Sequence, residues 1–325
     1  MSLPDDLVGI AEAVRITSPN SYVLRGEERV FPEAEADPPP MLRSLETELY
    51  LWLYTRLSPG AAVGDPLGSR DLVNALSAAN QGTGTWEAGW RIVAVEEDGS
   101  LAVARDEVTF WVPPAGVRTA SGRHDAGDYC RVRVGKELRN LMPGFYVAIG
   151  NGETDRDRPR PLLRLYWHLT AEAAAPYMAA MTGALNGLGL PFRTKVLADP
   201  AAYRRADAGV LYVERRFFGR IRPALREVHE ALAGGLRPEV PMFTRPLAPG
   251  LGAAEDPGDG QSFGQARCRS ASRALWAAYQ SKAEDVEARA AALADVFAQE
   301  GLDVENLHLA PGSKKVYDLA RGKKR

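Results

Sequence analysis

This chain of 325 residues has few cysteines, a small net charge and no long apolar run. Its two cysteines, Cys130 and Cys268, have neither the spacing of metal ligands nor the number that a disulfide framework needs, which favours a reducing, cytoplasmic location. The formal net charge of −2 gives the whole molecule no attraction to nucleic acid, so any anion must be bound by a local cluster of cations. No apolar run approaches the roughly 20 residues that span a bilayer. We therefore expect neither nucleic acid nor a membrane as a partner.

Common cofactor and metal motifs are absent as well. The loop Pro249–Gly252 is rich in glycine, but no Gly-Lys-Ser/Thr follows it, so it is not a phosphate-binding P-loop. The sequence contains no dinucleotide-binding Gly-x-Gly-x-x-Gly and no His-Glu-x-x-His. We therefore expect neither a metal nor a cofactor.

Hydrophobic periodicity predicts helices and strands in an irregular order. Helical spacing covers residues 41–57, and Ser69 suits the N-cap of a helix over 70–79. Further helices are predicted at 171–186, 220–233, 265–281 and 284–301. Strands are predicted at 91–95, 101–105, 108–112, 130–134, 145–149, 162–169, 192–197 and 209–213. Because no regular βαβα rhythm appears, the predicted class is α+β.

A polar, proline-containing stretch over 151–161 predicts a boundary or an exposed loop. It divides the chain into two predicted parts. Residues 1–150 form an N-terminal helical and β module, a candidate for binding a peptide or a partner. Residues 151–325 form the domain that carries the candidate chemistry.

One predicted strand of the second part has a polar face and an apolar face. Side chains alternate along a strand, so Arg164, Tyr166 and His168 share one face, and the intervening residues are all apolar. The apolar face of such a strand packs against a core, and its polar face lies toward a polar cleft or solvent. The alternative is a solvated sheet face with a hydrogen-bonded histidine.

The strand over 192–197 repeats this arrangement with Arg193 and Lys195 on one face. A neighbouring arginine favours the neutral amine of a lysine and lowers its pKa, as a general base requires. A solvated strand face is again the alternative. Because one helix joins the two strands, their polar faces can point into one cleft.

Arginines suited to binding an anion follow these strands. Arg205 with Asp207 offers a fixed guanidinium fork that suits a phosphate, the alternative being a surface ion pair. Ser262 could cap a helix whose N-terminal amides point at an anion, with Arg267 in the first turns of that helix. The alternative is that the loop before this helix is only a surface connection. One histidine, one crowded lysine and several arginines and tyrosines suit the elimination of a phosphate ester.

Four motifs of the second part together resemble the HopA-type effector family. They are Arg-Leu-Tyr-Trp-His-Leu-Thr at 164–170, Pro-Phe-Arg-Thr-Lys-Val-Leu at 191–197, Tyr-x-Arg-x-Asp-Ala-Gly-Val-Leu-Tyr at 203–212, and the block from Phe243-Thr244 to Ser262-Phe263-Gly264. The combination is specific although each piece alone is not. The resemblance covers most of residues 43–281, more weakly toward the N-terminus.

The resemblance implies both a fold and an activity. The family is similar in fold to bacterial phosphothreonine lyases, which implies a mixed sheet flanked by helices. Stand-alone relatives act in the biosynthesis of ribosomally made, modified peptides, namely class V lanthipeptides and thioamitides. There a separate kinase that resembles aminoglycoside phosphotransferases phosphorylates Ser or Thr of a precursor peptide, which consists of a leader and a core. The HopA-like partner then eliminates the phosphate and leaves dehydroalanine or dehydrobutyrine, so the resemblance implies a carbon–oxygen lyase acting on phosphate.

The resemblance also implies roles for individual residues. They are Lys195 as the base, His168 as the acid, Arg193 and Arg164 as flanking cations, Arg205 and Tyr212 at the phosphate, and Arg245 and Arg267 beside them. One departure stands out, because the lyase strand carries Lys-x-His whereas here Tyr166 takes the place of that lysine. Two other functions are open, a non-catalytic phosphopeptide-binding or kinase-scaffolding protein and a type III effector-like protein.

Overall fold

The computed structural model of the chain describes residues 3–33, 35–58, 60–105, 108–139, 142–153, 160–258 and 260–320. Helices and antiparallel sheets are mixed in it, which confirms the predicted α+β class. Most of the predicted boundary loop over 151–161 lies outside the described residues.

A seven-stranded sheet forms the centre of the molecule, in the order β14-β15-β11-β13-β12-β10-β9. Every neighbouring pair in it is antiparallel. Its strands are β9 (Glu137–Leu138), β10 (Phe145–Ile149), β11 (Leu162–Trp167), β12 (Phe192–Leu197), β13 (Gly209–Glu214), β14 (Arg245–Ala248) and β15 (Leu251–Glu255). The sheet therefore draws strands from both sides of residue 150, and the division of the chain into two domains stays a prediction.

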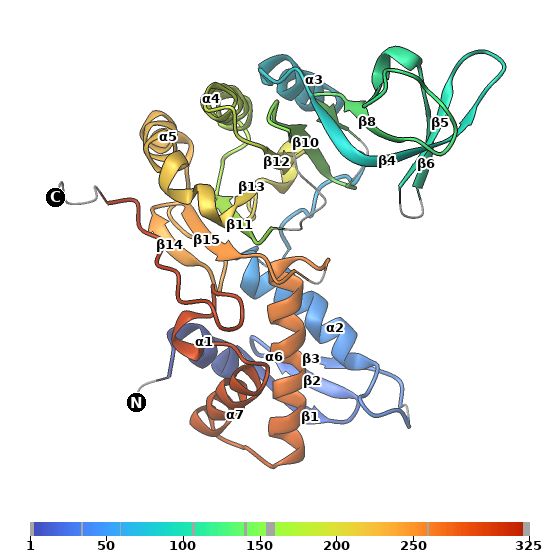
Figure 1. Cartoon of the computed structure of the whole chain (residues 1–325). Helices are drawn as coiled ribbons and strands as arrows, with labels where there is room; N and C mark the ends of the chain where they lie inside the picture. Colours follow the sequence, from blue (N-terminus) through green and yellow to red (C-terminus); the bar gives the residue numbers. More distant parts are fainter. Residues whose placement is uncertain are drawn as a thin grey trace.

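Three helices cover the apolar face of this sheet, and Figure 1 shows them in a row along one side of it. They are α3 (Arg70–Ala79), α4 (Ala174–Gly187) and α5 (Phe218–Ala231). The alternation along β11 explains this contact, because Leu163, Leu165 and Trp167 are fully buried among helix residues such as Met178 and Ile221. The opposite, polar face of β11 and β12 points away from these helices.

A second core lies on the other side of the sheet and joins the two ends of the chain (Figure 1). From the N-terminal end come α1 (Asp5–Ala13), β1 (Val14–Ser18), β2 (Ser21–Leu24), β3 (Glu27–Val30) and α2 (Met41–Glu48). From the C-terminal end come α6 (Phe263–Gln280) and α7 (Val286–Gln299). Leu7, Leu45 and Phe297 are fully buried where these pieces meet.

A smaller five-stranded sheet projects from the central one, in the order β6-β5-β4-β8-β7 (Figure 1). Its strands are β4 (Thr85–Val95), β5 (Leu101–Arg105), β6 (Val108–Val112), β7 (Val117–Thr119) and β8 (Tyr129–Val134). Trp90, Ile92 and Val103 belong to its own small core. The buried Glu87 of β4 ties it to the central sheet, because its carboxylate accepts a hydrogen bond of 2.9 Å from Arg193 on β12.

Short helical turns complete the described part of the chain. They are the π-helix η1 (Leu49–Tyr54) and the 3-10 turns η2 (Pro114–Gly116), η3 (Pro200–Ala202), η4 (Arg215–Phe217), η5 (Ala233–Gly235) and η6 (Val304–Asn306). The helix predicted over 41–57 is thus α-helical only as far as Glu48 and then widens into η1. None of the described helices is long and apolar enough to cross a membrane.

Candidate functional site

The two polar strand faces lie on the same face of the central sheet. Strand β13 pairs with both β11 and β12, so that Arg164, Tyr212 and Arg193 form one row across the sheet. The next row contains Tyr166, Val210 and Lys195. Directly paired residues project to one face, and two strand spacings separate β11 from β12 by about 10 Å. The structure therefore brings the two predicted sets together, with β13 between them.

Lys195 is the lysine of this face, on β12. Its amine lies 3.9 Å from the centroid of the Phe145 ring. Burial lowers the pKa of Lys195 to about 8; Asp207 opposes this shift, whereas Arg164 and Arg205 add to it. The sequence predicted that Arg193 would lower this pKa. Instead Arg193 donates to Glu87, and the cations that act on the amine come from β11 and from the loop before β13.

Arg205 and Asp207 form a buried pair beside Lys195. The Nε and Nη2 atoms of Arg205 each donate to one oxygen of the Asp207 carboxylate, both at 2.8 Å. Burial alone would raise the pKa of Asp207, but Arg205 holds it below its ordinary value. The fork predicted to grip a phosphate thus holds Asp207. In the described part of the chain, Nη1 is the guanidinium nitrogen that makes no hydrogen bond.

The other two arginines of the face are also paired with carboxylates. Arg164 donates from Nε to Asp256 at 2.7 Å and from Nη2 to the carbonyl of Gln261 at 2.8 Å. Glu87 accepts from Arg193 as described. Among the described residues, Lys195 makes no ion pair within 4 Å. A bound phosphate dianion would therefore meet one unpaired ammonium and three arginines whose charges are already partly balanced.

Tyrosines cover the cations on the side of the second core. The ring of Tyr166 meets that of Tyr54 edge to face, at 6.3 Å between centroids. Tyr212 lies under the guanidinium of Arg164, at 5.3 Å. Burial raises the pKa of Tyr166, an effect that Arg164 opposes. These hydroxyls are neutral at physiological pH and can donate hydrogen bonds.

His168 lies just beyond the end of β11 and is almost completely buried. Its Nδ1 is 3.0 Å from the carbonyl oxygen of Glu239, which can only accept, so Nδ1 carries the hydrogen. Burial lowers the pKa of His168, and its Nε2 makes no hydrogen bond within the described ranges. The structure shows no contact between His168 and Lys195 among the residues that it describes. The assignment of His168 as the acid stays a prediction.

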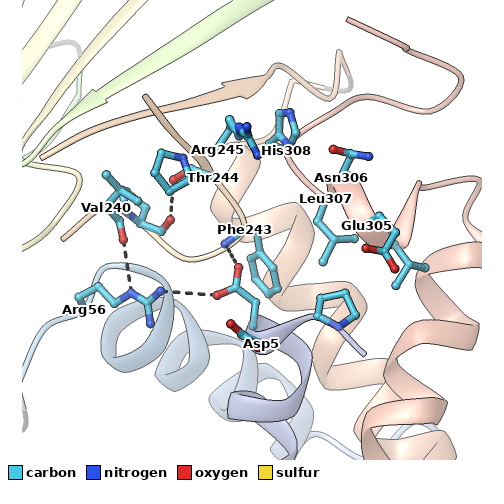
Figure 2. Close-up of a pocket in the computed structure, with 15 residues that line it drawn as sticks. Asp5, Arg56, Val240, Phe243, Thr244, Arg245, Glu305, Asn306, Leu307 and His308 are labelled. Atoms are coloured by element: carbon cyan, nitrogen blue, oxygen red, sulfur yellow. Dashed lines mark hydrogen bonds and ion pairs between the residues drawn. The ribbon is translucent and has the colours of Figure 1, made fainter. Parts of the chain in front are cut away.

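Arg245 lies far from Lys195. It belongs to β14, the edge strand, four strand positions or about 19 Å from β12. Figure 2 shows Arg245 beside His308 in a pocket of about 280 Å³, which Arg56 and Asp5 also line. Burial lowers the pKa of His308, and Arg245 contributes to the shift. The structure thus does not bring Arg245 to the polar face.

Arg267 and Ser262 have structural partners in α6. Arg267 is buried and donates from Nε to the carbonyl of Leu307 and from Nη2 to that of Leu309, at 3.0 and 2.9 Å. Ser262 accepts from the amide of Gln265 at 3.1 Å, so it is the N-cap that the sequence predicted. Their roles at a phosphate stay predictions.

Ser262 also stands in a Gly-x-Ser-x-Gly pattern, residues 260–264. In hydrolases this pattern places the serine on a tight turn directly between a strand and a helix. Here β15 ends at Glu255, and a six-residue loop separates it from the cap of α6. The hydroxyl of Ser262 is engaged by the helix, so its surroundings do not match those of a nucleophile.

Two tyrosines of η1 escaped the sequence analysis. Tyr50 donates to Asp207 at 3.0 Å and accepts from Arg205 at 3.2 Å, and Tyr54 stacks on Tyr50 at 5.2 Å between centroids. The sequence offered one signal, because tyrosines four residues apart share a helix face. Helical spacing over 41–57 predicted a helix there and no role for its tyrosines. No group of three or more His, Cys, Asp or Glu side chains that could hold a metal occurs among the described residues.

Comparisons with known proteins give the chain a family. The chain is similar to two solved structures. They are the effector protein from Pseudomonas syringae pv. tomato strain DC3000 (16% identity, TM-score 0.48, covering 83% of this chain and 94% of that one) and the effector protein from Pseudomonas syringae pv. syringae strain 61 (17% identity, TM-score 0.44, 81% and 88%). No curated protein sequence matches the chain. Residues 137–309, more than half of the chain, match the HopA1 effector protein family. The match includes β9 to β15 and therefore the whole central sheet. The resemblance inferred from the motifs is thus confirmed, and the chain belongs to the HopA1 effector protein family.

Proposed function

We propose that this protein is a phosphoserine or phosphothreonine lyase that eliminates phosphate from a phosphorylated precursor peptide. The observation that carries the proposal is the position of Lys195, an amine without an ion-pair partner in the described chain, set among Arg164, Arg205 and the ring of Phe145. An amine in such surroundings is partly neutral near physiological pH. It can therefore act as a general base beside cations that stabilise a developing negative charge.

The reaction balances with the residues of this face. The neutral amine of Lys195 takes the Cα proton of the phosphorylated residue, and the electron pair of that C–H bond forms the Cα=Cβ double bond. The Cβ–O bond breaks, and its electron pair leaves with the phosphate. His168 donates a proton to the departing oxygen. The products are inorganic phosphate and dehydroalanine from serine or dehydrobutyrine from threonine.

The remaining side chains supply charge and hydrogen bonds. The carbonyl next to Cα gains negative charge as the proton leaves, and the guanidinium groups of Arg164 and Arg193 stabilise it. The free Nη1 of Arg205 and the hydroxyl of Tyr212 bind the phosphate. Tyr166 occupies the place of the lysine in the lyase strand and can donate a hydrogen bond where that lysine would supply a charge.

The proposal places the protein in the biosynthesis of ribosomally made, modified peptides of the lanthipeptide type. Its partners would be a precursor peptide with leader and core and a separate kinase that resembles aminoglycoside phosphotransferases. A cytoplasmic location suits both partners. Support for this context comes from the resemblance to the HopA-type family that the motifs at 164–170 and 191–197 carry, since that resemblance implies such partners.

The test is the conversion of a synthetic phosphothreonine peptide, followed by mass spectrometry. The full chain should remove the mass of phosphoric acid and leave a product that reacts with thiols. Lys195→Ala should abolish the reaction, whereas Lys315→Ala, at an exposed lysine of the C-terminal segment, should retain it. Full activity of Lys195→Ala would refute the assigned base. If neither Lys195→Ala nor His168→Ala affects maturation of the precursor, the protein is a non-catalytic binding partner.

A further inference from the structure

The π-helix η1 connects the N-terminal part of the chain to the polar face, although it lies outside the stretch that matches the family. A backbone hydrogen bond of 3.0 Å from Thr55 to the carbonyl of Tyr50 closes its wide turn. Its end is fixed to two loops of the family region. The amide of Ala206 donates to the carbonyl of Thr55 at 2.7 Å, and that of Met242 donates to the carbonyl of Tyr54 at 3.0 Å. Turns of this kind often occur at functional sites.

The first of these loops carries the Arg205–Asp207 pair. Ala206, which bonds to η1, stands between the two charged residues. Tyr50 reaches the same pair with its side chain, since its hydroxyl donates to Oδ2 of Asp207 at 3.0 Å and accepts from Nη2 of Arg205 at 3.2 Å. One backbone bond and two side-chain bonds therefore fix the loop to η1.

These bonds determine which nitrogen of Arg205 stays available. Nε and Nη2 are occupied by Asp207 and Tyr50, whereas Nη1 makes no hydrogen bond in the described part of the chain. The guanidinium carbon lies 6.0 Å from the centroid of the Phe145 ring, and the amine of Lys195 lies 3.9 Å from the same centroid. Both cations therefore lie near the same aromatic ring, that of Phe145, and so Arg205 and Lys195 are neighbours.

We propose that Tyr50 is a positioning residue of the phosphate site, which holds the Asp207–Arg205 pair so that Nη1 of Arg205 faces the anion beside Lys195. This inference rests on the proposed lyase function and extends it to a residue outside the family region. A buried ion pair keeps one geometry only when its remaining hydrogen-bonding groups are satisfied. Without the hydroxyl of Tyr50, Oδ2 of Asp207 loses a donor and Nη2 of Arg205 loses an acceptor. The pair can then rotate, and the fork no longer presents Nη1 in a fixed direction.

Tyr50→Phe tests this role, because it removes one oxygen and keeps the stacked ring. Tyr22→Phe is the matched control. Tyr22 is also a buried tyrosine of the N-terminal part, and its hydroxyl donates to a carboxylate, that of Glu48, at 3.0 Å. It belongs to β2, in the three-stranded N-terminal sheet and not in the central sheet that carries the polar face. The two variants therefore lose the same kind of bond, and only one of them loses it at the site.

Two readouts are measured on the full chain. The first is the rate of phosphate release from a phosphothreonine peptide as its concentration is varied. Tyr50→Phe should raise KM about 5- to 10-fold and leave kcat within about twofold, because the contact that it weakens, from Nη1 of Arg205 to the phosphate, is made in substrate and transition state alike. The second is the rise in melting temperature caused by inorganic phosphate. It should be lost in Tyr50→Phe, whereas Tyr22→Phe should match the wild type in KM and in the phosphate-induced rise.

The outcomes separate this inference from the proposed function. A wild type that releases no phosphate refutes the lyase, and the phosphate-induced rise in melting temperature then decides the role of Tyr50 alone. A Tyr50→Phe variant with the KM and the rise of the wild type overturns the positioning role while the lyase stands. Equal increases of KM in both tyrosine variants would also overturn it, since they would reflect a general loss of stability. A wild type that phosphate does not stabilise likewise contradicts an anion site at Arg205.

Discussion

At the scale of single residues, the chemistry of the polar face depends on how its cations are paired. Three arginines hold carboxylates, whereas Lys195 holds none among the residues that the structure describes. Its amine is therefore the group of this face whose protonation is least fixed by a partner. His168 shows the opposite bias. Burial lowers its pKa below the ordinary value of about 6.5, which disfavours the protonated form that a general acid needs. At neutral pH, Lys195 is therefore mainly protonated and His168 mainly neutral, whereas the reaction needs the opposite form of each.

This arrangement predicts a particular dependence of kcat/KM on pH. The reactive form needs a neutral Lys195, whose pKa is about 8, and a protonated His168, whose pKa is below its ordinary value. Below the pKa of His168 the histidine is charged but the neutral lysine becomes rarer. Above about 8 the lysine is neutral but the protonated histidine continues to decrease. We expect a bell-shaped profile whose maximum lies between the two values.

The variant His168→Asn assigns the limbs of this profile. It should lower the rate at every pH and remove the decline above pH 8, so that the remaining activity rises with pH to a plateau as Lys195 loses its proton. Steady-state rates from pH 5 to 10 check this. A variant that keeps the alkaline decline would contradict the role of His168 as the acid.

At the scale of elements, the strands that carry the site could be predicted, because alternation is a local property. Strand β12 was predicted with its observed bounds, and β11 with an end two residues too late. The helix over 70–79 and its cap Ser69 were also correct, since N-caps have a clear residue signature. In contrast, α1 and β1 to β3 were missed. The burial of α1 comes from contacts with α7 and that of β1 from contacts with α6, both more than 200 residues away in the chain.

The partners of the predicted site residues were the part that the sequence could not supply. Which carboxylate an arginine holds depends on the meeting of distant segments, as in the bond from Arg164 to Asp256, 92 positions later. Likewise, the widening of a helix into η1 brings Tyr50 to Asp207, 157 positions away. Periodicity cannot report such encounters. It correctly predicted the face that Lys195 occupies but attributed its lowered pKa to Arg193 alone.

The contact between η1 and α6 predicts an effect of a single methyl group. A Cβ added at Gly264 would collide with the ring of Tyr54, whereas one added at Gly219 in α5 meets nothing within 4 Å. Gly264→Ala should lower the free energy of unfolding by about 1 to 3 kcal/mol, because neither the ring nor α6 can move easily in a packed core. Gly219→Ala should leave it unchanged or raise it by up to about 1 kcal/mol. Urea unfolding of both variants checks this, and equal effects would contradict the assigned contact.

At the scale of the whole molecule, the C-terminal segment links the two cores. Leu307 belongs to the second core, around α6, and Leu309 belongs to the core between the central sheet and the helices α3, α4 and α5. Arg267 holds the carbonyls of both residues. Farther on, Tyr317 packs in the central core and donates to the fully buried carboxylate of Glu255 at 2.6 Å. The C-terminal segment is therefore part of both cores, and we expect the two cores to unfold together.

Replacing the guanidinium tests this linkage. Arg267→Met keeps most of the apolar stem and leaves two buried carbonyls without their donor, so it should lower the free energy of unfolding by about 2 to 4 kcal/mol. The KM for a phosphothreonine peptide should stay at the value of the wild type at temperatures where the variant is folded. A large increase of KM with unchanged stability would instead assign Arg267 to the phosphate.

The central claim is that the polar face removes a proton from Cα and expels phosphate, and isotope labelling tests it most directly. The substrate is a peptide whose phosphothreonine carries deuterium at Cα, and mass spectrometry follows the product. The account predicts a dehydrobutyrine peptide that has lost both the phosphate and the deuterium, formed by the wild type and not by Lys195→Ala. Recovery of threonine with its deuterium would mean hydrolysis of the ester, and an unchanged phosphopeptide would mean binding without chemistry; either result would contradict the account.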